Sequence, residues 1–417
     1  MIKNRKFEIN NMKNKITIKQ IFEENFEEFW EKNKSKYPES MREHIQCEVK
    51  KMLGCGNTAL GFVVWICMIC IEIFKVGFTC KSRFCVKCGK KYVSNWVEKQ
   101  VDRLLDVPHR HCIFTIPEEF RMYFFRNREG LKDMQDMVSE VLMEYANGVN
   151  ENNRKEYEKK KRAKKGDLLW KVGMIGVAHT FGRNLGFNPH IHALVAEIKM
   201  KGKEVVEMPY LDYKYLRRVW QHKLINYMIK KESAKKIEYL RMFKKYKNGF
   251  VIHAKSRMAD AKGAARYIGR YLARPAIAEY RILSYDGETV RFWYEDHKTK
   301  ERMEETLTVE KFIGKLLMHI TPKNFRMARS YGIYAGSIAV KVKKCYGLLK
   351  YIKSGLKAIQ YTLKEYWKKK TQKLTFRELM IRNFSKDPLK CRRCGEEMEL
   401  WEIWHSKYGY IYDLSKC

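Results

Sequence analysis

The sequence has no apolar run long enough to cross a membrane. Its longest run, residues 62–71, is about half of the ~20 residues that a membrane-spanning helix needs. The charged N-terminus is followed by no apolar segment, so we expect no secretory signal. A GxxxxGK motif followed by Ser or Thr, the phosphate-binding loop of many helicases, is also absent. We therefore expect a cytoplasmic protein without a helicase domain.

Acidic residues are few relative to basic ones. The 417 residues include 85 Lys and Arg against 48 Asp and Glu, which gives a net charge of +37 and a pI of about 9.7. Such a surplus repels itself unless it meets a polyanion, so nucleic acid is the expected partner. A merely soluble basic protein and a membrane-surface protein are the alternatives. The length allows two or three domains.

The 12 cysteines are expected to be thiols or zinc ligands, because no export signal is evident. Four of them form two Cys-x-x-Cys pairs separated by 14 residues, which is close to zinc-ribbon spacing. The pairs are Cys67 with Cys70 and Cys85 with Cys88. We expect these thiolates to hold one tetrahedral zinc ion and so to fold a segment too small to fold alone. Cys55 and Cys80 could replace one ligand or help to hold a second ion; free cysteines or a redox pair are the alternatives.

Basic residues surround the second of these cysteine pairs. They include Lys81, Arg83 and Lys87. Because basic side chains neutralise DNA phosphates, we expect the zinc-ribbon-like module, residues 51–100, to contact DNA as well as to hold zinc.

The two ends of the chain have a helical character. Residues 1–50 carry apolar residues at helical spacing and most simply form one packed helix. Residues 341–417 are expected to form a basic helical tail. That tail contains a third pair, Cys391 with Cys394, which lacks two ligands. His405, Cys417 or Cys345 could complete a zinc site there.

A pair of histidines two residues apart is the central chemical feature. Side chains two apart on a strand point the same way, so a strand over about 189–196 would project His190 and His192 together. A second β-like run, residues 173–181, could pair with it as a hairpin and place His179 opposite or diagonal to them. Three imidazoles would form a metal site with coordination positions left open. Isolated histidines two apart more often occur by chance than as metal ligands.

A further strand is expected over residues 108–117, where it could lie beside the histidine hairpin. His109 and His111 on this strand are rival metal ligands. We rank them below His179, because no local hairpin places them at the site.

A predicted helix that runs from Ala261 to its stop at Pro275 carries two phenols and two guanidiniums on one face. They are Tyr267, Arg270, Tyr271 and Arg274. Paired tyrosines on a helix are more often packing residues than nucleophiles, but guanidiniums suit phosphate recognition. Arg266 is a further candidate for DNA contact. A phenol is a poor nucleophile unless its phenolate is favoured or its target is activated by a metal.

Five motifs in order resemble the rolling-circle transposases of the insertion-sequence ninety-one family, within the HUH endonuclease superfamily. The resemblance covers about residues 45–340. The matching pieces are the Cys67–Cys88 zinc module with Cys80–Cys85, His109–His111 with Phe114–Pro117, His179–Arg183, Asn188–His192, and Tyr267–Tyr271. Val86 is a departure, since proline is expected there in the zinc module.

The resemblance implies a mechanism. The histidines would hold a divalent ion, usually Mg²⁺ or Mn²⁺, that polarises a phosphate of single-stranded DNA at an element end or target. Tyr267 and Tyr271 would be the nucleophiles and would form a 5′-phosphotyrosine, so that rejoining needs no ATP. The three histidines His179, His190 and His192 also resemble the metal site of conjugative relaxases. The protein would act in the cytoplasm of a bacterium, in association with the nucleoid.

The expected fold is α+β, with an HUH-endonuclease-like core in which helices flank a mainly antiparallel sheet. The expected segments are the N-terminal helix (1–50), the zinc module (51–100), the core (101–340) and the tail (341–417). A relaxase or rolling-circle replication initiator with the same chemistry is the nearest alternative function. A non-catalytic zinc-dependent DNA-binding regulator is the alternative from another class.

Overall fold

The computed structural model describes residues 16–416 except for residues 102, 164–167, 273–274 and 297–298 and most of the stretch 337–386. The chain divides into two compact units. The larger unit contains residues 1–46 and 95–346, and the smaller one contains residues 47–94 and 347–417. Among the described residues, no helix combines the length and the apolar character needed to cross a membrane.

The larger unit is built on an antiparallel six-stranded sheet. Its order is β11-β4-β5-β3-β7, and β6 pairs with β5. The strands are β3 (His109–Thr115), β4 (Lys171–Phe181), β5 (Phe187–Lys201), β6 (Glu204–Glu207), β7 (Ile252–Met258) and β11 (Ala328–Tyr331). Most of β4 and β5 is buried, which explains their long apolar sequences. The predicted hairpin and the predicted strand beside it are confirmed.

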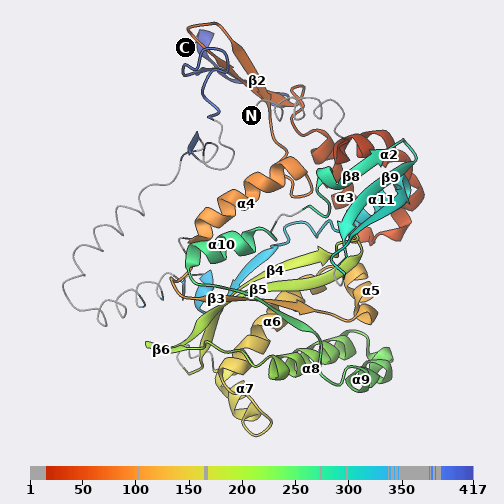
Figure 1. Ribbon diagram of the computed structural model, residues 1–417, viewed down its shortest axis with the longest axis vertical. Coiled ribbons are helices and arrows are strands. Elements are labelled where there is room, and N and C mark those ends of the chain that lie inside the picture. Colours follow the sequence, from red (N-terminus) through yellow and green to blue (C-terminus); the bar gives the residue numbers. More distant parts are fainter. Residues whose placement is uncertain are drawn as a thin grey trace, which may run out of the picture. The chain divides into compact units, whose positions relative to one another are not determined.

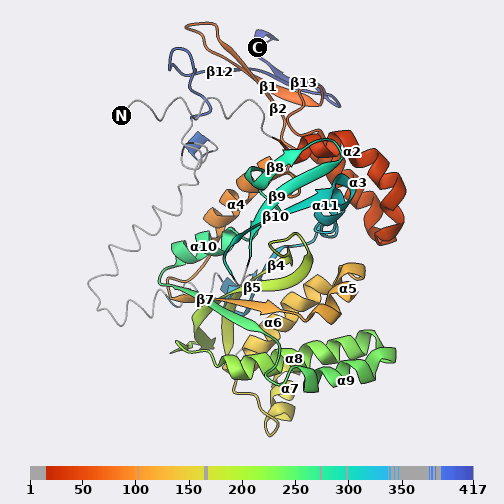
Figure 2. The ribbon, with the colours of Figure 1, turned by 45° about the vertical axis from the view of Figure 1, so that its right-hand side comes forward.

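Helices cover one face of this sheet and bury the main core. They are α5 (Glu118–Arg126), α6 (Gly130–Ala146), α8 (Tyr213–Lys231) and α9 (Lys236–Lys245). Ile191 and Ala193 of β5 point into this core, so the alternate residues of β5 face the other way. Trp220 of α8 packs edge-on against Phe114 and donates a hydrogen bond to the Thr115 carbonyl at 2.8 Å. Figures 1 and 2 show α6 and α8 on this side of the sheet and α10 on the other.

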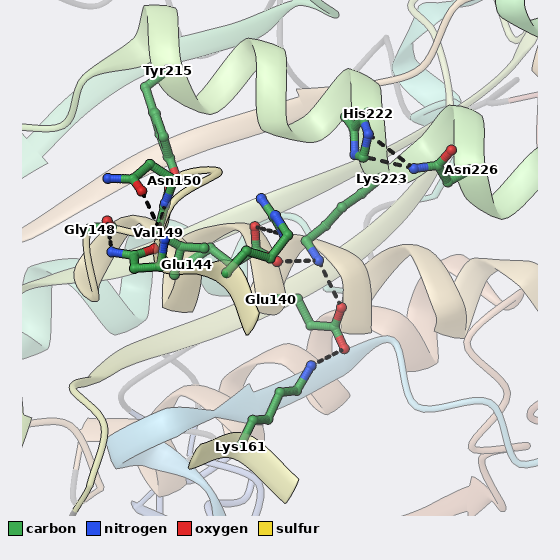
Figure 3. A network of polar contacts seen from close by, with 12 residues as sticks. Glu140, Glu144, Gly148, Val149, Asn150, Lys161, Tyr215, His222, Lys223 and Asn226 are labelled. Atoms are coloured by element: carbon green, nitrogen blue, oxygen red, sulfur yellow. Dashed lines mark hydrogen bonds and ion pairs between the residues drawn. The ribbon is translucent and has the colours of Figure 1, made fainter. Parts of the chain in front are cut away.

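An ion-pair network fixes α8 and the lysine-rich α7 (Arg154–Arg162) on α6. Lys223 of α8 lies 2.6 Å from the carboxylate of Glu144 and 3.1 Å from that of Glu140 (Figure 3). Lys161 of α7 lies 3.3 Å from Glu140. Because Glu144 is only 1% exposed, its charge needs this pairing to offset the cost of leaving water. The network therefore holds together the helices that support the sheet.

The helix α10 (Ala261–Gly269) packs on the opposite face of the sheet. Its N-terminus is capped by Asp260, whose carboxylate accepts the Gly263 N–H at 2.7 Å. The prediction of a helix that runs on to Pro275 is wrong, because the helix ends at Gly269. Tyr271 lies in the following turn, where its N–H donates to the Ile268 carbonyl at 3.0 Å. Residues 273–274 lie outside the described part of the chain.

A second, three-stranded sheet follows α10 and packs with two helices. It contains β8 (Ile282–Tyr285), β9 (Thr289–Glu295) and β10 (Arg302–Thr308), and the helices are α11 (Val309–Leu317) and α2 (Ile18–Asn33). The Tyr285 hydroxyl lies 2.7 Å from the Asn25 amide nitrogen, which joins this sheet to α2. The N-terminal segment is not one helix: α2 stops before Pro38, and α3 (Glu39–Leu53) begins after it. Proline lacks the N–H that a continuous helix needs.

The smaller unit joins distant parts of the chain in one four-stranded antiparallel sheet of order β13-β12-β1-β2. The strands are β1 (Gly61–Ile66), β2 (Ile73–Gly77), β12 (Glu399–His405) and β13 (Gly409–Asp413). The division into four consecutive segments therefore differs from the two units, because the zinc module and the C-terminal segment fold together. Within the expected helical tail, β12 and β13 are strands rather than helix, and residues 351–374 lie outside the described part of the chain.

Candidate metal centres and active site

Three histidine side chains meet on the face of the sheet away from the main core. His179 of β4 lies opposite His190 of β5 in the antiparallel register, and His192 projects from the same face of β5. The Nε2 atom of His190 lies 3.2 Å from Nδ1 of His179 and 3.1 Å from Nε2 of His192. Possible ligand atoms of all three residues lie within 4.8 Å of one another. The structure thus brings together the histidines that the sequence grouped, and their metal-binding role stays a prediction.

The backbone fixes the tautomer of the central histidine. Nδ1 of His190 lies 2.7 Å from the carbonyl oxygen of Asn188. A carbonyl oxygen can only accept a hydrogen bond, so Nδ1 carries a proton and, in the neutral ring, Nε2 presents its lone pair to the other imidazoles. Desolvation lowers the pKa of His190 to about 4, which keeps the ring neutral at neutral pH. Three imidazoles grouped in this way suit a divalent transition-metal ion.

His111 of β3 connects the histidine cluster to a tyrosine. Its Nε2 atom lies 2.9 Å from Nδ1 of His192, and its Nδ1 atom lies 3.2 Å from the hydroxyl oxygen of Tyr267. Among the described residues, the candidate metal cluster includes neither His111 nor His109, the two rival ligands. His109 instead contacts the hydroxyl of Tyr334 at 2.7 Å. The sequence placed the 108–117 strand beside the hairpin but did not show that His111 would connect the histidine cluster to Tyr267; the pairing of β3 with β5 brings it there.

Both candidate tyrosines lie against the histidines. The ring of Tyr271 stacks on His192 with centroids 3.9 Å apart and planes 21° apart. The guanidinium of the exposed Arg270 lies 4.4 Å from the centre of the Tyr267 ring. Arg266 is also exposed, whereas Arg274 lies outside the described residues. Two phenols beside the candidate metal centre, with two arginines open to solvent, could receive a phosphodiester.

Four cysteines form the first sulfur cluster. It consists of Cys55, Cys80, Cys85 and Cys88. The Cys88 sulfur lies 3.6 Å from that of Cys55 and 3.5 Å from that of Cys80. Zn–S bonds of ~2.3 Å put tetrahedral sulfurs about 3.8 Å apart, so the cluster fits zinc. The hydrogen bond from Cys80 is the largest of the effects that lower the pKa of Cys85 to about 5, which favours its thiolate.

The structure pairs the Cys-x-x-Cys motifs differently from the sequence prediction. The expectation that the first two pairs share one ion is wrong, because Cys67 and Cys70 lie in a separate cluster with Cys391 and Cys394. Cys55 and Cys80, which were expected to replace one ligand or to help hold a second ion, complete the set around the second pair. His405 belongs to neither cluster, and residues 345 and 417 lie outside the described part of the chain.

The predicted DNA-contacting residues of the zinc module differ in exposure. Lys81 and Lys87 are exposed, whereas Arg83 is half-buried and desolvation lowers its pKa. The two lysines are therefore the better placed for contact with phosphate. DNA contact by all three residues stays a prediction.

Comparisons with known proteins find one matching family for each of two parts of the chain. Residues 21–116 match the family described as a transposase zinc-binding domain, and residues 173–342 match the family described as a putative transposase. The chain is 28% identical over 367 residues to the transposase for insertion sequence element IS801 of Pseudomonas savastanoi pv. phaseolicola. That alignment covers 84% of this chain and 82% of the relative.

A second relative covers less of the chain. The chain is 24% identical over 317 residues to a putative transposase of Sinorhizobium fredii, an alignment that covers 71% of this chain and 76% of the relative. No solved structure matches the chain.

The larger domain match includes the three histidines and the tyrosine helix, and the zinc-domain match includes the first sulfur cluster.

Proposed function

Because this chain is a transposase of the insertion-sequence ninety-one family, we propose that it cuts and rejoins single-stranded DNA at the ends of its element through a tyrosine. The observation that carries the proposal is the position of Tyr267 and Tyr271 against the histidine cluster. A candidate nucleophile and a candidate metal centre in contact are the two components that metal-assisted phosphodiester transfer requires.

The proposed reaction exchanges one phosphodiester for another. The phenolic oxygen of Tyr267 or Tyr271 loses its proton and bonds to the phosphorus, and the bond to the 3′ oxygen of the preceding nucleotide breaks. That oxygen takes up a proton and leaves as a 3′-hydroxyl, while the 5′ end stays attached to the tyrosine. A 3′-hydroxyl can reverse the same step at another site, so joining needs no ATP.

His179, His190 and His192 are the residues that would hold the ion. A bound divalent cation would supply polarisation of the phosphate and stabilisation of its developing charge. Imidazole nitrogen suits transition ions better than Mg²⁺, which prefers oxygen, so this donor set favours Mn²⁺ over Mg²⁺. Arg266 and Arg270 are exposed on the tyrosine helix and in the turn after it, where they would bind the phosphates on either side of the cut.

His111 would position the Tyr267 nucleophile. If His192 held the ion through Nε2, its Nδ1 would carry the ring's proton and would donate a hydrogen bond to Nε2 of His111. Nδ1 of His111 would then carry the proton of that ring and would donate a hydrogen bond to the Tyr267 hydroxyl oxygen. A hydrogen bond donated to that oxygen stabilises the negative charge on a phenolate. Metal ligation and nucleophile orientation are thereby linked through one imidazole.

The proposal is tested with a labelled single-stranded oligonucleotide that carries an element end as a hairpin. We expect incubation with Mn²⁺ to give a covalent protein–DNA adduct that survives denaturing electrophoresis. Trypsin then identifies the nucleophile, because cleavage after Arg266 and Arg270 places Tyr267 and Tyr271 on different peptides. Binding without any adduct would identify the chain as a DNA-binding regulator and contradict the proposal.

A substitution series at His111 tests its positioning role. We expect His111→Ala to slow adduct formation at Tyr267 by about 10–100-fold, the usual effect of losing a residue that orients a metal ligand. The side-chain amide nitrogen of asparagine lies close to the position of Nδ1 of a histidine. The amide nitrogen of the longer glutamine lies close to the position of Nε2. His111→Asn should therefore preserve the contact to Tyr267, and His111→Gln should preserve the contact to His192.

Two measurements separate these effects. Calorimetric Mn²⁺ affinity should stay near that of the unchanged protein in His111→Gln and fall in His111→Asn. The rate of adduct formation at Tyr267 should stay near the normal rate in His111→Asn and fall in His111→Gln, because only the glutamine variant loses the contact to the Tyr267 hydroxyl. His222→Asn on α8 serves as the control, because α8 covers the opposite face of the sheet. Unchanged Mn²⁺ affinity and an unchanged rate of adduct formation at Tyr267 in all His111 variants would exclude the positioning role.

A further inference from the structure

We propose that Cys67, Cys70, Cys391 and Cys394 hold a second structural zinc ion that fastens the C-terminal strands to the N-terminal zinc module. The Cys67 sulfur lies 3.4 Å from that of Cys394, and the Cys70 sulfur lies 3.5 Å from that of Cys391. All four sulfurs lie within 4.8 Å of one another, as four thiolates around one ion require. The two motifs are more than 300 residues apart in the sequence, with separations of 321 and 327 between the contacting cysteines.

Each motif forms the same local turn. The N–H of Ile71 donates to the Cys67 carbonyl at 2.9 Å, and the N–H of Gly395 donates to the Cys391 carbonyl at 3.0 Å. In both turns this fifth residue has a positive φ, +58° at Ile71 and +82° at Gly395. Glycine adopts this conformation freely, whereas a β-branched isoleucine is strained in it. A zinc ion held by Cys67 and Cys70 would keep the turn at Ile71 in this strained conformation.

The strand register places the two turns face to face. β1 ends at Ile66, which pairs with Glu399 at the start of β12. Cys67 therefore follows β1 at the same end of the sheet at which Cys391 and Cys394 precede β12. A bridge between Lys390 and Glu397 closes the second turn as a small hairpin, just as β1 and β2 close the first. The result is a zinc ribbon assembled from two distant segments of the chain.

The apolar core around these cysteines is too small to hold the turns by itself. Its buried members are Cys67, Cys391 and Met398, with Trp65, Cys70 and Phe74 packed partly buried against them. Several neighbouring apolar side chains are exposed instead, including Ile69 at 74% and Ile71 at 63%. Segments with so little buried apolar area fold when a metal ion supplies the missing free energy.

Disulfides do not explain the cluster. An S–S bond is ~2.05 Å long, whereas these sulfurs are 3.4 Å and 3.5 Å apart and all four cysteines are free. Two separate pairs would also leave no reason for all four sulfurs to converge. The chemistry of the site is therefore that of a zinc ion held by four thiolates, and the C-terminal segment is part of the zinc module.

The test counts zinc bound to the purified full-length protein by elemental analysis. Every variant carries His190→Ala, so that the histidine cluster does not contribute. We expect about two zinc ions per chain in this background, one for each cluster of four cysteines. Serine substitution of Cys391 and Cys394 should remove one ion, and substitution of Cys67 and Cys70 should remove the same one. Cys47→Ser is the control, because Cys47 is exposed and belongs to neither cluster.

Two quadruple variants separate this pairing from the one that sequence spacing favours. Serine at Cys67, Cys70, Cys391 and Cys394 together should still remove only one ion, whereas serine at Cys67, Cys70, Cys85 and Cys88 should remove both. The opposite counts would overturn the proposal. Cys394→His is a second test for the case in which the serine variants do not fold. Histidine also binds zinc, so this variant should keep both ions. A Cys391, Cys394 serine variant that retained two ions would also overturn the proposal.

Discussion

Replacing Tyr267 and Tyr271 together with phenylalanine is expected to reduce adduct formation at least ~1000-fold, to below detection, because no nucleophilic oxygen remains. Phenylalanine keeps the ring, so the stacking on His192 at 3.9 Å should persist and DNA affinity should change little. The measurement pairs adduct yield on denaturing gels with oligonucleotide affinity from fluorescence anisotropy. A loss of adduct at unchanged affinity would assign the chemistry to these two phenols.

Single phenylalanine substitutions at Tyr267 and at Tyr271 distinguish the roles of the two tyrosines. Tyr267 receives the contact from His111, whereas Tyr271 lies directly on a candidate metal ligand, so the two phenols meet different environments. If both act in successive transfers, each single variant should form an adduct on the remaining tyrosine but fail to complete strand transfer. Tyr280→Phe is the matched control, since that side chain is 68% exposed. A normal adduct yield in the double variant would refute the assignment.

Replacing His192 with alanine is expected to slow metal-dependent cleavage by more than ~100-fold, beyond the loss from a residue that merely orients a ligand. His192 contributes in three ways: Nε2 faces the other imidazoles, Nδ1 contacts His111, and the ring supports Tyr271. The ligand set and the nucleophile should therefore be disturbed together. His190→Ala should lower metal affinity as well, but without directly displacing Tyr271.

The measurement for the histidine variants combines cleavage rate as a function of Mn²⁺ concentration with direct Mn²⁺ binding by electron paramagnetic resonance. Both His192→Ala and His190→Ala should lose the binding signal. His222→Ala provides the control on the far side of the sheet. Metal-dependent cleavage at an unchanged rate in His192→Ala would contradict the metal centre, whatever the tyrosine variants show.

The site histidines could be predicted because their geometry is local. A strand alternates its side chains with a period of two, and a hairpin with a short turn fixes which residues lie opposite each other. Those two facts bring His179, His190 and His192 together with no information from elsewhere in the chain. The tyrosine helix was predictable for the same reason, although Tyr271 proved to lie in the turn beyond its end.

Contacts between distant segments were beyond such reasoning. His111 reaches the site only because β3 pairs with β5 across more than 70 residues, a choice made by the packing of the whole sheet. The cysteines show the same limit more strongly. Spacing favoured joining the neighbouring pairs, but Cys67 and Cys70 meet Cys391 and Cys394 because β1 pairs with β12.

Sequence by itself therefore determined the residue types of the site, the histidine hairpin and the resemblance to a transposase family. Tertiary structure alone decided which cysteines cluster together and which histidine connects the histidine cluster to a tyrosine. The reason is physical: backbone geometry sets short-range register, whereas long-range pairing depends on which surfaces bury the most apolar area when the chain closes on itself.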